Sequence, residues 1–102
     1  MQDSNDILRS AVVSIEAVTT FFYQQKEKEG YEKLDGTLTA IGLAMNEIHK
    51  QGDTNERFFT IERNINSFLN NAMEALTIKD SILLADILLY EVAEQFRSAM
   101  DQ

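Results

Sequence analysis

A chain of 102 residues with 44% hydrophobic residues is long enough to form a single core, and we expect residues 1–102 to fold as one domain. Nine basic against 17 acidic residues give a formal net charge of −8, which disfavours binding to nucleic-acid phosphates and to anionic membranes. The absence of cysteine excludes disulfides, thiol nucleophiles and thiolate zinc sites.

The rest of the composition favours long helices in a cytoplasmic protein. The chain has no proline and only four glycines, so few residues would interrupt helical structure. After Met1, residues 2–6 are polar or acidic, and the N-terminus lacks the charged-then-apolar pattern of a secretion signal. Together with the lack of cysteine, this pattern predicts a cytoplasmic location.

The first helix is expected over about residues 4–25, with Asp3 or Ser4 as its N-terminal cap. Apolar residues recur there at spacings of three and four, which is typical of an amphipathic helix. They are Ile7, Leu8, Ala11, Ile15, Val18 and Phe22. A polar connector follows, and Gly30 is expected to end helical structure there as a C-terminal glycine cap.

The second helix is expected over about residues 31–50. Its apolar positions alternate steps of three and four, the pattern of helices that pack along a narrow seam. They are Tyr31, Leu34, Leu38, Ile41, Met45 and Ile48. Gly42 lies beside this seam and would allow a close approach of a second helix, whereas the pattern offers no reason for Gly36.

The third helix is expected over about residues 54–77, after a turn in which Gly52 ends the second helix and Asp53 or Thr54 caps the third. Its apolar residues again share one face. They are Phe58, Ile61, Ile65, Phe68, Leu69, Ala72, Met73 and Leu76.

The fourth helix, over about residues 80–99, is the most apolar, and Asp80 is placed to cap it. Its apolar residues cover more than half of the helix circumference, which predicts burial against more than one neighbour. They include Leu83, Leu84, Ala85, Ile87, Leu88, Val92 and Phe96. The short link at residues 77–79 forces an antiparallel hairpin with the third helix. The sequence therefore predicts an all-α protein, an up-down-up-down four-helix bundle.

Glu91 is the candidate site residue with the least usual position, because it falls inside the apolar arc of the fourth helix. A buried carboxylate must be paired, hydrogen-bonded or protonated. It is either a perturbed acid at a functional site, one half of a structural ion pair, or a residue at a bundle edge that stays wet. Possible partners for an ion pair are Arg9, Lys33 and Arg63.

Asp86 and Tyr90 are two further candidate positions, on the polar side of the same helix. Five residues along a helix change the side-chain direction by about 140°, so Asp86 and Glu91 point apart. We therefore expect that they do not form an acid/base pair.

The search for catalytic motifs leaves only His49, the single histidine. The spacing Glu47-Ile-His49 does not match the Glu-x-x-His pairs of di-iron bundles. The order His49-Lys50-Gln51-Gly52 resembles the region around the phosphorylated histidine of histidine phosphotransfer domains, with shifted spacing. Its place at a helix C-terminus favours a role at the helix dipole. We expect no catalytic residues, no cofactor and no metal.

Residues 75–91 contain Ala-Leu, a short link with Asp, and Leu-Leu-Ala-Asp-Ile-Leu-Leu-Tyr-Glu. This stretch resembles short, uncharacterised helical proteins of Gram-positive bacteria that carry a Leu-Leu-Ala-Asp-x-Leu-x-Tyr-Glu helix. The resemblance implies a bacterial protein without an assigned chemistry. At the level of the fold, the chain is also similar to export and flagellar chaperones, which are small acidic helical bundles.

Three functional hypotheses follow. The first is a non-catalytic protein-interaction module, an adaptor or chaperone, that binds a protein partner or a second copy of itself. Its candidate contact residues lie off the main apolar faces: Val13, Phe21, Leu43 and Leu89. The second is a small-ligand-binding or enzymatic bundle that uses Glu91 or Asp86. The third is histidine phosphotransfer through His49.

Overall fold

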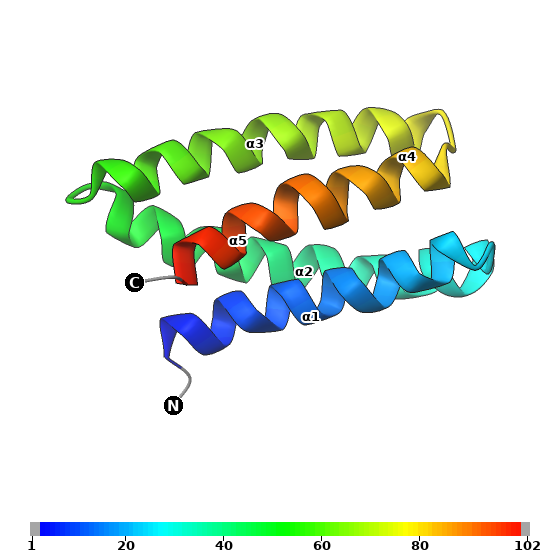
Figure 1. Ribbon diagram of the computed structural model, residues 1–102, viewed down its shortest axis with the longest axis horizontal. Coiled ribbons are helices and arrows are strands. Elements are labelled where there is room, and N and C mark those ends of the chain that lie inside the picture. The colour runs from blue at the N-terminus through cyan, green and yellow to red at the C-terminus, as the bar shows by residue number, and fades with distance from the viewer. Residues whose placement is uncertain (1–2, 101–102) are drawn as a thin grey trace.

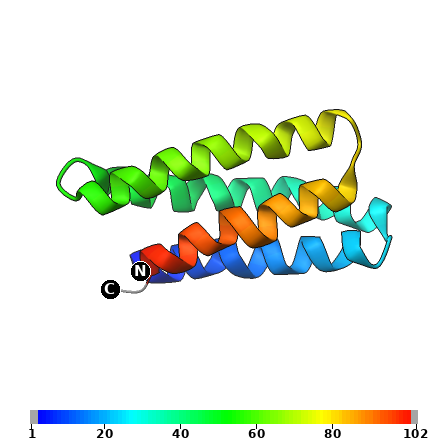
Figure 2. The same cartoon turned by 45° about the horizontal axis from the view of Figure 1, so that its top comes forward.

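The computed structural model describes residues 3–100, and all of its regular structure is helical. Three long helices are followed by a fourth helical rod made of two α-helical parts and a π-helical turn between them. The elements are α1 (Ser4–Tyr23), α2 (Glu27–Gly52), α3 (Glu56–Thr77), α4 (Ser81–Asp86), η1 (Ile87–Val92) and α5 (Ala93–Met100). The four rods alternate in direction, and the start of α1 and the end of α5 lie at the same end of the bundle (Figures 1 and 2). The predicted up-down-up-down four-helix bundle is confirmed.

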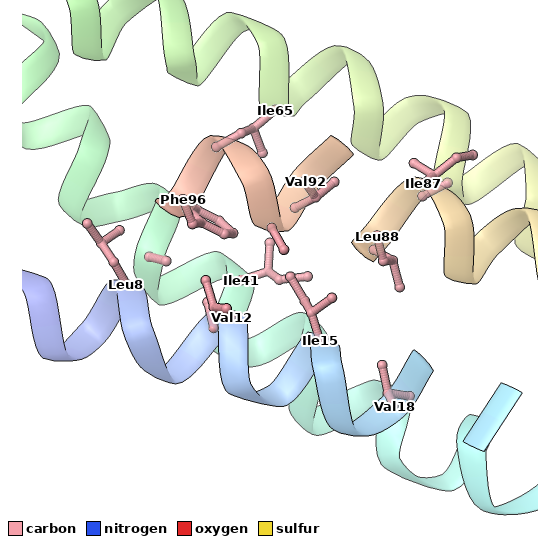
Figure 3. Packing of buried hydrophobic residues seen from close by; sticks show 14 of the residues in the cluster. Leu8, Val12, Ile15, Val18, Ile41, Ile65, Ile87, Leu88, Val92 and Phe96 are labelled. Carbon is pink, nitrogen blue, oxygen red and sulfur yellow. The ribbon is translucent and has the colours of Figure 1, made fainter. Parts of the chain in front are cut away.

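The rod formed by α4, η1 and α5 packs against both α1 and α3. This position explains the wide apolar arc of its sequence, because two neighbours need two buried faces. Leu84, Leu88, Val92 and Phe96 are fully buried. Figure 3 shows Leu88 and Phe96 on the side of the rod that faces α1, near Ile15 and Val12. One member of the predicted arc departs from it: Leu83 is exposed.

Side-chain caps begin three of the helical rods. The N–H of Asp6 donates to Asp3 Oδ1 at 2.9 Å, and that of Leu83 donates to Asp80 Oδ1 at 3.0 Å, as the sequence predicts. The prediction that Asp53 or Thr54 caps α3 is wrong. Asn55 does so, with its own backbone extended and its side chain accepting from the N–H of Arg57 at 3.0 Å.

The prediction that Gly30 stops a helix is also wrong, since α2 begins at Glu27 and contains Gly30 in its first turn. The left-handed residue of the α1–α2 link is Gln25 (φ 60°). Gly30 is instead needed for packing, because a Cβ atom there would lie 2.5 Å from a ring carbon of Phe22. The Phe22 ring also packs edge-on against Tyr31, with ring centroids 5.1 Å apart.

Gly42 does not mediate the close helix approach that the sequence suggests. It is exposed, and a Cβ atom at Gly42 or at Gly36 would meet nothing within 4 Å. Both glycines therefore lie on the open face of α2, where packing does not require a glycine.

The π-helical turn η1 is the one irregularity in the fourth rod. The N–H of Ala93 donates to the carbonyl of Leu88, five residues earlier, in place of the four of an α-helix. Turns of this kind are rare and are frequently found at functional sites. In this chain the turn contains three of the candidate residues, Leu89, Tyr90 and Glu91.

Candidate functional site

A groove of about 730 Å³ lies where the end of α3 meets the start of the fourth rod. The α3–α4 hairpin forms it, and the two elements run side by side at that end of the bundle (Figure 1). Nine residues line the groove: Asn71, Met73, Glu74, Ala75, Thr77, Ile78, Leu83, Ile87 and Glu91. It is open to solvent rather than enclosed.

Three large apolar side chains are exposed in this groove. Met73 is 37% exposed, Leu83 is 41% exposed and Ile78, in the turn after α3, is 68% exposed. Single exposed apolar residues are ordinary on protein surfaces, but a group of them within one concave surface is typical of an interaction site. The groove is therefore the strongest candidate site in the described part of the chain.

Glu91 is half-buried and lines the groove. The ion pair considered for it is absent from the described residues. Arg9 pairs with Asp6 at 3.0 Å, whereas Lys33 and Arg63 lie over the rings of Phe21 and Phe59. Of the two structural alternatives, an ion pair and a bundle edge in contact with water, the position of Glu91 fits the bundle edge.

The π-helical turn supplies part of the groove wall. Leu83, Ile87 and Glu91 follow each other at intervals of four residues, and the latter two belong to η1. Glu74 lies on the opposite wall, on α3. The groove thus combines apolar lining residues with one glutamate from each of its two walls, and its lining contains no lysine, arginine or histidine.

Asp86 and Tyr90 belong to a second cluster, on the side of the rod that faces α1. The hydroxyl of Tyr23 donates to Asp86 Oδ1 at 2.5 Å. Burial raises the pKa of the Tyr23 hydroxyl well above its usual value, and the hydrogen bond to Asp86, the charge of Asp86 and nearby Tyr90 raise it further. Asp86 and Glu91 thus lie on different faces of the rod, as the helical spacing predicts.

The four predicted contact residues are not part of the groove. Val13 and Leu43 are exposed, and Val13 lines a separate shallow depression on α1 with Asp6 and Arg9. Phe21 and Leu89 are half-buried, and Leu89 packs against the core. None of the four therefore shares the groove with Glu91.

His49 lies in the last turns of α2, with Nδ1 2.7 Å from Glu62 Oε2 on α3. The pair joins the ends of two neighbouring helices. Within residues 3–100, no group of three or more histidine, aspartate and glutamate side chains is placed to hold a metal ion. No helix in that range has the length and apolarity that a membrane crossing requires.

A protein-family model described as Domain of unknown function (DUF8042) matches residues 1–102. The chain belongs to this family. DUF8042 membership confirms the expectation of a family without an assigned chemistry. The Gram-positive origin and the helix motif of residues 75–91 stay predictions. The comparison with curated proteins found no match, and neither did the comparison with solved structures.

Of the nine groove residues of this DUF8042 domain, the sequence analysis singles out only Glu91, and it misses the three exposed apolar ones, Met73, Ile78 and Leu83. Met73 and Leu83 fit the apolar faces of their helices, and so both were assigned to the core. Ile78 was treated only as part of a link. It did carry a usable signal, because a large apolar residue in a three-residue turn has no helix face along which to be buried.

Proposed function

We propose that the protein is a non-catalytic protein-interaction module, an adaptor or chaperone-like bundle, and that the groove of the α3–α4 hairpin is its binding surface. The observation that carries this proposal is the exposure of Met73, Ile78 and Leu83 within one groove. A partner bound there would remove apolar surface from water, which contributes a favourable free energy of about 25 cal/mol per Å². We also propose that the protein acts in the cytoplasm, as the sequence predicts.

The test compares two exposed aliphatic residues of similar size. Ile78 is 68% exposed in the groove and Leu43 is 59% exposed on α2 outside it. Tagged wild-type protein, Ile78→Asp and Leu43→Asp are used to capture proteins from a lysate of the source organism, and the captured proteins are quantified by mass spectrometry. Circular dichroism checks that each variant is folded.

We expect a partner that is retained by the wild type and by Leu43→Asp but is lost with Ile78→Asp. If Ile78→Asp retains every partner while Leu43→Asp loses one, the surface suggested by the sequence is correct and the groove is not the binding surface. If both variants retain every partner of the wild type, neither surface is the binding surface.

A small-ligand site is a second candidate, favoured by Glu91 and by the groove volume of about 730 Å³. That volume lies within the range of small-molecule pockets, roughly 300–1,000 Å³. Such a ligand would be apolar with a cationic group. Binding would raise the unfolding temperature of the wild type and would raise that of Glu91→Gln by less. A thermal-shift series with alkylamines measures both increases.

A further inference from the structure

We propose that the occupant of the groove is a short amphipathic helix of a partner protein with lysine or arginine beside its apolar face. This inference rests on the function proposed above and specifies the chemistry of the partner. Two properties of the groove support it: its dimensions and its charge.

The dimensions suit a helix of a few turns. One wall extends from Leu83 through Ile87 to Glu91, and eight residues correspond to about 12 Å, or slightly more than two helical turns. The other wall is the end of α3, with Met73, and the turn that follows it, with Ile78. A helix laid between two helices in this way contacts them with apolar residues at positions i, i+4 and i+7.

The charge of the groove selects a basic helix. Glu91 on one wall and Glu74 on the other have no ion-pair partner within residues 3–100. A cationic side chain on each flank of the bound helix would meet one of these carboxylates. An ion pair at a partly exposed edge contributes roughly 0.2–1 kcal/mol, but it also decides which helices are accepted.

The same charges argue against a second copy of the chain as the occupant. Each copy has a formal net charge of −8, and a symmetric contact through the groove would bring both copies of Glu74 and Glu91 together. Anionic lipid is disfavoured for the same reason, because its surface potential repels acidic proteins.

Three labelled peptides of about 15 residues, long enough to form a helix on binding, test this proposal. They share one apolar face of leucines, and their flanking positions carry lysine, glutamine or glutamate. Affinities for the full chain are measured by fluorescence anisotropy at about 0.15 M salt, where exposed charges act over roughly 8 Å. We expect the lysine peptide to bind most tightly and the glutamate peptide least tightly.

Matched protein variants separate the groove from the general negative field. Glu74→Gln combined with Glu91→Gln removes two charges in the groove, and Glu32→Gln with Asp35→Asn removes two from the exposed face of α2. We expect the first pair to weaken lysine-peptide binding by about three- to tenfold and the second by less than about twofold. Ile78→Asp should abolish measurable binding.

Equal losses for the two double variants would overturn the proposal, because binding would then follow the overall charge. Equal affinity for lysine and glutamate peptides would overturn the basic flank and leave the proposed function intact. If none of the three peptides binds, the helical occupant is refuted, and the capture experiment decides separately whether the groove binds a protein of another shape.

Discussion

Replacing Gly30 with alanine tests whether this glycine is present for packing. A Cβ atom at this position would lie 2.5, 2.7 and 3.0 Å from three ring carbons of Phe22. Carbon atoms in contact are normally about 3.5–4.0 Å apart, so the closest pair would overlap by about 1 Å. The Phe22 ring is fully buried, so neighbouring core side chains would have to shift with it.

Two opposing contributions determine the result. Alanine in a helix is more stable than glycine by up to about 1 kcal/mol. Overpacking of a filled core costs about 1–3 kcal/mol. We therefore expect Gly30→Ala to lower the free energy of unfolding by about 1–2 kcal/mol, a fall in the unfolding temperature of several degrees. Urea unfolding followed by circular dichroism measures it.

Gly36→Ala is the matched control on the same helix. Nothing lies within 4 Å of a Cβ atom there, so only the gain in helix propensity acts, and the variant should be stabilised by up to about 1 kcal/mol. In a Phe22→Leu background, Gly30→Ala should cost less than it does in the wild type. Wild-type stability or better for Gly30→Ala alone would refute the packing argument.

The remaining predictions concern polar groups. Asp80→Ala should lower the free energy of unfolding by about 0.5–2 kcal/mol, because it removes the acceptor for the N–H of Leu83. The control Asp53→Ala should change the free energy of unfolding by less than about 0.5 kcal/mol, since Asn55 and not Asp53 caps α3. Equal effects of the two substitutions in urea unfolding would contradict the capping assignment. The pKa of Tyr23 is higher in the folded state than in the unfolded chain, so the neutral hydroxyl contributes its full stabilisation below about pH 10. Above that pH the Tyr23 hydroxyl of the unfolded chain ionises first, and this contribution to the stability of the folded state is progressively lost. Asp86→Asn should lower the Tyr23 pKa in a spectrophotometric titration, and Tyr23→Phe should reduce the loss of stability above pH 10; an unchanged titration would exclude the contribution of Asp86.

Much of the fold follows from the sequence alone because local physics is enough for it. The helical spacing of apolar residues does not depend on what packs against them. The predicted apolar faces of α1 and α2 are therefore correct, and Ile15 and Ile41 lie in the core as expected. The caps of α1 and of the fourth rod, Asp3 and Asp80, are correct for the same reason, since a cap is a contact within four residues.

Other features depend on contacts between distant residues, and the tertiary structure alone decides them. Gly30 resembles a helix stop in sequence, but its role is set by a Phe22 ring on another helix. Glu91 has no partner within residues 3–100 because Arg9 and Lys33 lie near other groups.

The groove belongs to this second class. Leu83 and Met73 have the spacing of core residues, and only the packing of the bundle shows that no element within residues 3–100 covers them at the end of the α3–α4 hairpin. The sequence by itself therefore determined which face of each helix is apolar. The tertiary structure decided which part of that apolar surface stays in contact with water, because burial requires a neighbour and periodicity does not specify one.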